Sequence, residues 1–446
     1  MGRESSNPGG GNPRLARLRG FPRPPDCDRE VALLHPMFTL FAILLTLTAS
    51  FSYLNVRLLR LPAGILFMLL GTAAAAGILV AGHYSPAFVA ATRLMLAQLD
   101  FPELLLGNVL SFLLFAGSLH VRYAALRAAA RSITAFATVG VIISTVLGGA
   151  AAYYLLQLVG LGVPLLPCLV FGAMLAPTDP VAVLGIVKET KLAPVVATNL
   201  VGESLFNDGV GVVIFSTLLV LALPAGVPPT AGAVGLLLLR EVVGGLLAGL
   251  AIGYVGYRLM KSIDHFQTEI LITLAMVVGG YTLCRALHIS GPLAMVVAGV
   301  FTGNRSVADA MSAQTQDYLI KFWDVLDEVL NALLFVLIGL ELVVVGVQGT
   351  YLLLGAGVGL ALLAARYVAL WVPATLLGLR RTLPPRSLEI LTWGGLRGGI
   401  SLALALSLPR HLHPEAFVPM TLAVVICSLL VQGLTLGRVI TWLVGK

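Results

Sequence analysis

Long apolar runs recur along the whole chain and constrain its fold more than any other feature. Each is close to the roughly 20 residues that a membrane-spanning helix needs. Thirteen candidate spans are found, at residues 35–56, 61–82, 101–121, 132–158, 163–187, 195–223, 231–259, 266–288, 291–303, 319–346, 350–378, 387–408 and 416–442. Only 11% of the residues are charged, whereas soluble domains carry about 25%. The chain is therefore predicted to be an all-α integral membrane protein.

Two segments fit this pattern less well than the others. The run 291–303 is short enough to be a half-span, and residues 86–99 are short and polar enough to lie at the membrane interface. The first 30 residues are rich in Gly, Pro and Arg and are predicted to be a disordered tail. No obvious cleavage site follows the first apolar run, so we expect a retained helix rather than a signal peptide.

Lysine and arginine between the runs predict the orientation. When alternate loops are counted, one side holds sixteen of these residues and the other holds only Arg93 and Arg410. Basic loops stay on the cytoplasmic side, which places the C-terminus in the cytoplasm and the N-terminus outside, in a multi-pass protein of the cell membrane. The six arginines of the N-terminal tail oppose this assignment. The net charge of +7 is thus ascribed to topology rather than to nucleic acid, and the four scattered cysteines suggest neither a disulfide framework nor a metal cluster.

The fifth run contains "MLAPTDPVAV" (174–183), in which Pro177 and Pro180 flank an aspartate. Each proline frees the carbonyl four residues earlier and pushes the preceding residue out of the helical region. A break of this kind must face protein or a water-filled cavity rather than lipid. The freed carbonyls, the Thr178 hydroxyl and the Asp179 carboxylate would offer hard oxygen ligands for a small cation. The alternative is a kinked helix in which Asp179 has only a structural partner.

The sixth run carries "VGESLFNDGVGVVIF" (201–215), with two acids inside a span. Glu203 and Asn207 share one helix face, and Ser204 and Asp208 share another, because residues four apart are neighbours. The two acids are five positions apart, about 140° around the helix, and so should have different neighbours and roles. Intramembrane acids are functional candidates by default. Structural salt bridges are the alternative, more so for Glu203 than for Asp208.

The twelfth run contains "LTWGGLRGGISLALAL" (391–406), in which Arg397 lies among four glycines. The glycines loosen the helix and predict a second break, at Gly394, Gly395, Gly398 and Gly399. Arginine stays protonated in proteins, so Arg397 needs a carboxylate, and we expect an ion pair with Glu203. The alternative is that Arg397 extends to the membrane interface.

The two predicted breaks occupy the fifth and the twelfth runs, which are equivalent places if the chain is an inverted repeat of two six-helix halves. Paired interruptions of this kind indicate the midplane site of a secondary transporter. The predicted organisation is a tail over 1–30 and a transmembrane domain over 31–446. Within this domain, the first repeat covers 31–223, a linking helix covers 231–259, and the second repeat covers 266–446.

Other charged residues within or beside the runs are weaker candidates. One group is expected either to pair between helices or to reach the interface: Arg240, Glu241, Arg285 and Arg366. A second group could line the cytoplasmic opening or a dimer interface: Trp323, Asp324, Asp327, Glu328 and Asn331. The histidines at loops and helix ends are expected to be solvated, with pH sensing as the alternative: His265, His288, His411 and His413.

Three motifs together make the chain resemble the sodium/proton exchangers of the monovalent cation:proton antiporter family, in its bacterial branch. They are "APTDPVAV" (176–183), "GESLFNDGVGVV" (202–213) and "GGLRGGISLALAL" (394–406), and the resemblance begins near residue 35. It implies that Asp208 binds cation and proton in turn, and that the preceding Asn207 marks a branch exchanging one cation for one proton without net charge. It further implies a homodimer, and a site completed by Thr178, Asp179 and Ser204, in which Na⁺ contacts Asp208, Ser204 and Thr178.

One departure from the family pattern affects ion choice. Many members carry a glutamate in the third span, where "FLLFAGSLHV" (112–121) has Ala116. A second carboxylate near the site is thus missing, which bears on the choice among sodium, lithium and potassium.

The expected mechanism is competition for one buried carboxylate. Burial disfavours the bare charge, so that either a proton or a cation neutralises it, and only the neutralised site crosses the low-dielectric barrier. A cation channel is an alternative that would pass current without proton coupling. An inverted-repeat symporter of organic anions is another, although Asp208 without a basic cluster argues against it. No HExxH or GxSxG motif lies in a span, so we expect neither an enzyme nor a cofactor.

Overall fold

The structure, a computed structural model, describes residues 42–59, 61–97, 102–179, 183, 192–222, 230–345 and 349–445. Within these ranges the chain is built of helices and the turns that join them, and no strand is present. The prediction of an all-α protein is confirmed for this part of the chain. The predicted tail over 1–30 and Pro180 lie outside the described residues.

The first half of the chain contains a helix over Ala42–Leu58 and a series of further helices. They are α2 (Ala63–Ala81), α3 (Pro86–Ala97), α4 (Leu110–Leu119), α5 (Tyr123–Ala128), α6 (Ala130–Ala135), α7 (Val141–Leu158), α8 (Leu165–Met174) and α10 (Pro194–Ala222). Two π-helical segments, η3 (Glu103–Val109) and η4 (Phe136–Gly140), run directly into α4 and α7 without a break in the helix.

The second half repeats this pattern of long and interrupted helices. Its members are α11 (Ala231–Met260), α12 (Phe266–Ala286), α13 (Gly291–Phe301), α14 (Val307–Asp309), α15 (Ala313–Val345), α16 (Gly349–Leu376), α17 (Ser387–Trp393), α18 (Gly399–Leu406), α19 (Pro414–Cys427) and α20 (Leu434–Val444). The π-helical segment η8 (Ser428–Gly433) joins α19 to α20.

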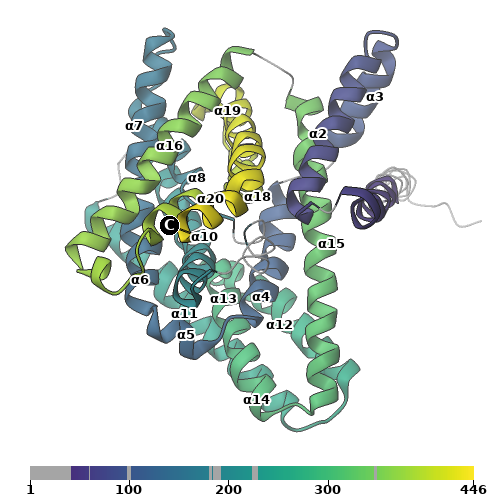
Figure 1. Ribbon diagram of the computed structural model, residues 1–446, viewed down its shortest axis with the longest axis vertical. Coiled ribbons are helices and arrows are strands. Elements are labelled where there is room, and N and C mark those ends of the chain that lie inside the picture. The colour runs from purple at the N-terminus through teal and green to yellow at the C-terminus, as the bar shows by residue number, and fades with distance from the viewer. Residues whose placement is uncertain are drawn as a thin grey trace, which may run out of the picture.

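Eight helices in the described ranges are long and apolar enough to cross a membrane, and four shorter apolar helices accompany them. Every predicted apolar run contains helix, but several runs are short or interrupted. The number of crossings therefore stays a prediction. The segment predicted at the interface forms α3, which folds back beside α2 (Figure 1).

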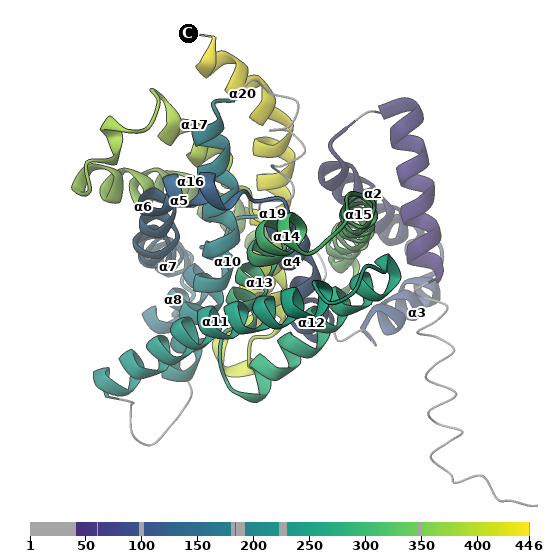
Figure 2. The same cartoon turned by 90° about the horizontal axis from the view of Figure 1, so that it is seen from below.

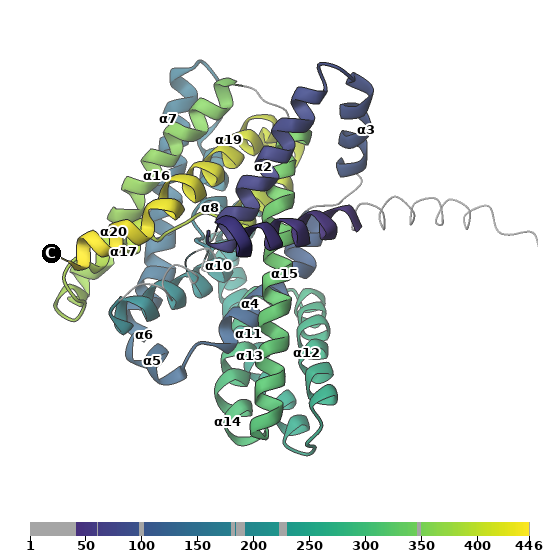
Figure 3. The ribbon, with the colours of Figure 1, turned by 45° about the vertical axis from the view of Figure 1, so that its right-hand side comes forward.

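Two helix pairs join the first half of the chain to the second. α2, the second run, lies along α15, the tenth, while α13, the ninth run, lies along α4, the third (Figures 1 and 3). Both pairs approach closely through glycine: a Cβ on Gly339 would lie 2.5 Å from the carbonyl carbon of Gly71, and a Cβ on Gly299 would overlap Ser118. α10 lies between the α7–α16 pair and the α2–α15 pair (Figure 2).

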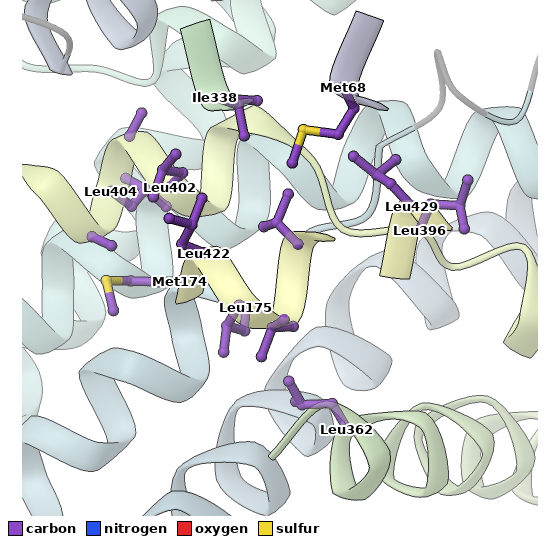
Figure 4. Packing of buried hydrophobic residues seen from close by; sticks show 14 of the residues in the cluster. Met68, Met174, Leu175, Ile338, Leu362, Leu396, Leu402, Leu404, Leu422 and Leu429 are labelled. Carbon is purple, nitrogen blue, oxygen red and sulfur yellow. The ribbon is translucent and has the colours of Figure 1, made fainter. Parts of the chain in front are cut away.

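Apolar side chains fill the space around the interrupted helices. Leucines, methionines and an isoleucine from α2, α8, α15, α16, α18, α19 and the adjoining loops meet in one buried cluster (Figure 4). Its labelled members are Met68, Met174, Leu175, Ile338, Leu362, Leu396, Leu402, Leu404, Leu422 and Leu429. This packing excludes water around the breaks, so the polar groups there depend on one another or on a ligand.

Candidate functional site

The first break follows α8 directly. The helix ends at Met174, the amide of Ala176 bonds only to Ala173 O at 3.3 Å, and residues 175–179 leave the helical path. Pro177 is the reason, because it lacks the N–H that would continue the hydrogen-bond ladder. The helix thus ends three residues before Pro177, and Pro180, the second proline expected at this break, lies outside the described residues.

The second break lies between α17 and α18, and it crosses the first. Residues 394–398 form a turn and extended backbone, as their glycines predict. The amide of Asp179 donates to Leu396 O at 2.8 Å, which joins the two breaks directly. Gly398 permits this approach, because a Cβ there would overlap the Asp179 carboxylate. Of the four glycines expected at this break, Gly394, Gly395 and Gly398 lie between the two helices, and Gly399 is the first residue of α18.

Arg397 contacts the first break rather than Glu203. Its Nη1 donates to the carbonyls of Ala176 and Pro177, at 2.5 and 2.9 Å, and its backbone amide donates to Ser428 Oγ at 3.0 Å. The two acceptors are thus carbonyls of the first break, where the helical ladder is interrupted. The charge of Arg397 therefore stabilises the crossing itself.

The predicted ion pair between Glu203 and Arg397 is wrong, because Glu203 pairs with Arg366 of α16. Arg366 Nη1 donates to Glu203 Oε1 at 2.7 Å, and Nη2 contacts Oε2, so the pair is bidentate. Both side chains are buried. Arg366 had been expected only to pair somewhere or to reach the interface. The clue in the sequence was its place near the middle of an apolar run, where a charge needs a partner.

A hydrogen-bonded network links the first break to α10. Thr178 Oγ1 and Ser204 Oγ lie 3.0 Å apart, and Asn207 Nδ2 donates to Thr178 Oγ1 at 2.7 Å. The same amide nitrogen reaches Glu203 Oε1 at 2.9 Å. The structure thus brings together the predicted site residues on α10 and at the break, and it connects them to the Glu203–Arg366 pair.

Asp208 lies next to this network but outside its hydrogen bonds. Its side chain is 1% exposed, and Oδ1 has no hydrogen-bond partner in the described part of the chain. Asp208, Asp179 and Thr178 line one cavity of about 50 Å³, together with the first residues of α18. A buried carboxylate oxygen without a partner is costly in free energy, and a bound proton or cation would lower this cost.

The family follows from comparison with known proteins. The family profile described as "Sodium/hydrogen exchanger, transmembrane" matches residues 43–442. The chain belongs to the sodium/hydrogen exchanger family. It is 42% identical over 412 residues to the Na(+)/H(+) antiporter NhaP of Pseudomonas aeruginosa, a match that covers 91% of this chain and 96% of the relative. It is 32% identical over 404 residues to the Na(+)/H(+) antiporter NhaH of Halobacillus aidingensis, which covers 89% and 96%.

A solved exchanger has the same fold. The structure of the sodium proton antiporter MjNhaP1 from Methanocaldococcus jannaschii at pH 8 matches with a TM-score of 0.73, over 93% of this chain and 100% of that one. The sequence identity is 18%, so this match concerns the fold alone. The family and the membrane-embedded helical fold that the three motifs predict are thereby confirmed.

In this member of the sodium/hydrogen exchanger family, several weaker candidates have structural partners away from the breaks. Arg285 pairs with Glu103 at 2.8 Å, and Arg240 donates to Leu287 O at 2.8 Å. The histidines at helix ends bond locally: His265 to Thr268 and His413 to Glu415, at 2.9 and 3.2 Å. These contacts secure helix ends and connect helices outside the cavity.

Three of the residues from the second half of the exchanger chain that line the cavity beside Asp208 have polar side chains. Asp327 and Asn331 line it from α15, where they had been expected at the cytoplasmic opening or a dimer interface. Ser401 of α18 was not predicted, although its place in the first turn after the second break was visible in the sequence. Ala116, which stands where many members have a glutamate, is buried on α4.

Proposed function

We propose that the protein exchanges a monovalent cation for a proton across the membrane, with Asp208 as the group that binds both. The observation that carries this proposal is the buried Asp208 Oδ1 without a hydrogen-bond partner, in a cavity at the crossing of two broken helices. The names of the relatives support the same reaction, since both are Na(+)/H(+) antiporters rather than enzymes.

The neighbouring oxygens suit a small hard cation. We infer that Na⁺ contacts the Asp208 carboxylate and the hydroxyls of Thr178 and Ser204, which lie 3.0 Å from each other. Asn207 holds the Thr178 hydroxyl in place by donating a hydrogen bond to it. Asp179 holds the first break in place through the bond from its amide to Leu396 O of the second break. Li⁺ and K⁺ present the same chemistry at different radii and are further candidate substrates.

The charges around the crossing support exchange of one cation for one proton. On α10, on α16 and at the two breaks, two arginines, Arg366 and Arg397, lie near three carboxylates, those of Glu203, Asp179 and Asp208. Asp327 of α15 also lines the cavity and is not part of this set. With every group of the set ionised the sum is one negative charge, and one H⁺ or one Na⁺ at Asp208 brings it to zero. Both loaded states then cross the low-dielectric barrier at equal charge, whereas the empty state pays a desolvation penalty. Exchange is therefore electroneutral and tightly coupled.

Alternating access follows from movement of the crossed breaks relative to the helices on the other side of the cavity. The cavity is lined by the two breaks, α10 and α18, and also by η3, α4 and α15. We further propose that the basic loops and the C-terminus face the cytoplasm and that two copies form a homodimer. These assignments rest on the distribution of lysine and arginine and on the family resemblance.

Asp208→Asn tests the proposal most directly. In proteoliposomes with a pH-sensitive dye, added Na⁺ should dissipate an imposed pH gradient for the wild type and have no effect for the variant. Asp317→Asn is the matched control, because Asp317 is exposed and pairs with Lys321. Full exchange by Asp208→Asn would refute the role of Asp208. A Na⁺ current without proton movement would instead indicate a channel.

Competition at one site predicts how pH acts on exchange. A tenfold rise in proton concentration should raise the Na⁺ concentration for half-maximal rate by about tenfold wherever the proton dominates occupancy. The maximal rate at saturating Na⁺ should change little. Independent sites for Na⁺ and H⁺ would leave the half-maximal Na⁺ concentration constant, and this would contradict the shared carboxylate.

A further inference from the structure

A row of residues on one face of α15 leads from the surface of the protein to the cavity. Asp324, Asp327, Asn331 and Leu334 are spaced by three, four and three residues, which places them on one helix face. The last three line the cavity that contains Asp208. From Asp324 to Leu334 the helix rises about 15 Å, roughly half the thickness of a bilayer core.

Exposure falls steadily along this row. The Asp324 side chain is 52% exposed, Asp327 is half-buried, and Asn331 is 6% exposed. Leu334 ends the row against the second break, because its Cδ1 lies 2.7 Å from where a Cβ on Gly399 would be. The row therefore runs from solvent to the crossing of the broken helices.

The outer end of the row is held against the facing helix. His120, at the end of α4, contacts Asp324 Oδ1 through Nε2 at 3.1 Å, and its Nδ1 lies 3.2 Å from Ala116 O. Asn331 Nδ2 donates to Asp327 O at 2.9 Å, which fixes this amide on α15. The geometry of the row is thus set by contacts within the protein.

The facing wall offers no comparable group. η3 and α4 line the cavity with leucines and a glycine: Leu105, Leu110, Leu113, Leu114 and Gly117. Among the described lining residues that η3, α4 and α15 contribute, Asp327 is thus the one acidic residue. A cation losing its hydration water on this path is stabilised by α15 alone.

The geometry points to an outer cation station at Asp327, where a partly hydrated monovalent cation is bound before it reaches Asp208. This inference rests on the proposed exchange function and adds a second binding position to it. The unpartnered Oδ1 of Asp208 in the same cavity is the acceptor to which the cation moves on. Asp327 is half-buried whereas Asp208 is 1% exposed, so the outer station binds its cation less tightly and releases it inward. It binds the incoming cation and takes no part in the competition with protons at Asp208.

The station serves one side of the membrane. The row begins in the N-terminal half of α15, three residues after the exposed Lys321, and the N-terminal end of this helix is on the side predicted to be cytoplasmic. Removal of the Asp327 carboxylate should therefore raise KM for Na⁺ supplied on that side and leave KM for Na⁺ supplied on the opposite side unchanged. A merely structural role would disturb both directions equally.

Asp327→Asn tests this station, with Glu328→Gln as the matched control. Glu328 is the next residue along α15 and is exposed, so the control removes the same charge from another face of the helix. In proteoliposomes sorted by orientation, Asp327→Asn should raise KM for Na⁺ from the side of the basic loops about fivefold, with kcat within about twofold of wild type. Asp327→Glu should restore the lower KM.

The outcomes separate the station from the exchange function. Equal KM values for Asp327→Asn and Glu328→Gln, while the wild type exchanges Na⁺ for H⁺, would overturn the station and leave the exchange function standing. An equal rise of KM from both sides would likewise overturn it, because this is the result of a structural defect. If the wild type shows no exchange, the proposed function fails and the station fails with it.

Discussion

The two acids of α10 are equally inaccessible to solvent but have opposite surroundings. Glu203 is 0% exposed and Asp208 is 1% exposed, five residues apart on one helix. Glu203 accepts two hydrogen bonds from Arg366 and one from Asn207. Asp208 has an oxygen without a hydrogen-bond partner in the described part of the chain, and it lines a cavity. Burial by itself therefore does not distinguish a structural carboxylate from one that binds substrate, whereas the set of partners does.

With the proposed role of Asp208, this difference lets one helix both hold its place and bind an ion. The Glu203–Arg366 pair connects α10 to α16 with its charge fully compensated, so it has nothing to gain from a cation. Asp208 lies about 140° farther around the helix, and its Oδ1 has no hydrogen-bond partner in the described part of the chain. The helix is thus fixed on one face and available for binding on the other.

Breaking the Glu203–Arg366 pair should have the largest effect on stability. Arg366→Leu leaves Glu203 buried without its counter-charge, and loss of one partner of a buried pair costs about 3–5 kcal/mol. Thermal unfolding in detergent, followed by tryptophan fluorescence, should show a large drop in the midpoint. The double variant Glu203→Leu with Arg366→Leu is the control, since an apolar pair at these positions should recover most of the loss. Wild-type stability in Arg366→Leu would mean that Glu203 does not depend on this pair.

Filling the space at the crossing should lower stability less than Arg366→Leu does, and its main effect should be on exchange. Gly398→Ala places a Cβ against the Asp179 carboxylate, and overpacking of this kind costs about 1–3 kcal/mol. The crossing beside Asp208 must shift, so Na⁺-driven dye recovery should fall strongly while the Glu203 face stays intact. Gly279→Ala is the control, because no atom lies within 4 Å of a Cβ at that position. Equal exchange rates in both variants would show that the close contact is dispensable.

Much of this site was predictable because its determinants are local. The prolines and glycines that interrupt α8 and the α17–α18 segment act on their own backbone, and a single aspartate within an apolar run is conspicuous anywhere. The long apolar runs likewise predicted the helices, since length and composition are read within one segment.

The partner of Glu203 was not predictable in the same way. Two arginines, Arg366 and Arg397, each lie within an apolar run, and the choice between them depends on how α10 is rotated relative to α16. Glu203 and Arg366 are separated by 163 positions in the chain, so no spacing rule connects them. The role of Asp327 depends on the same kind of information, because only the packing of α15 against the breaks brings it into the cavity. Helix rotation and packing are properties of the assembled bundle rather than of any one segment.

Removing a hydroxyl on the Asp208 face should have a modest effect on both stability and affinity. Ser204→Ala deletes the hydrogen bond to Thr178, which contributes about 0.5–1.5 kcal/mol. If Ser204 also contacts the cation, the half-maximal Na⁺ concentration should rise about three- to tenfold with little change in the maximal rate. Ser401→Ala is the comparison, because Ser401 lines the same cavity from α18. An unchanged Na⁺ dependence in Ser204→Ala would remove this hydroxyl from the cation ligands.

The smallest effect on stability should come from the residue with the greatest effect on exchange. Asp208→Asn keeps the size of the side chain and removes the cost of a charge at an oxygen that has no hydrogen-bond partner in the described structure. Its unfolding midpoint should equal or exceed that of the wild type, by the equivalent of at most about 1 kcal/mol, in buffer free of alkali cations. Added Na⁺ should stabilise the wild type and leave the variant unchanged, since only a protein that binds the ion gains from mass action. A destabilisation comparable with that of Arg366→Leu would mean that Asp208, like Glu203, is a structural acid, and the contrast between the two faces of α10 would no longer hold.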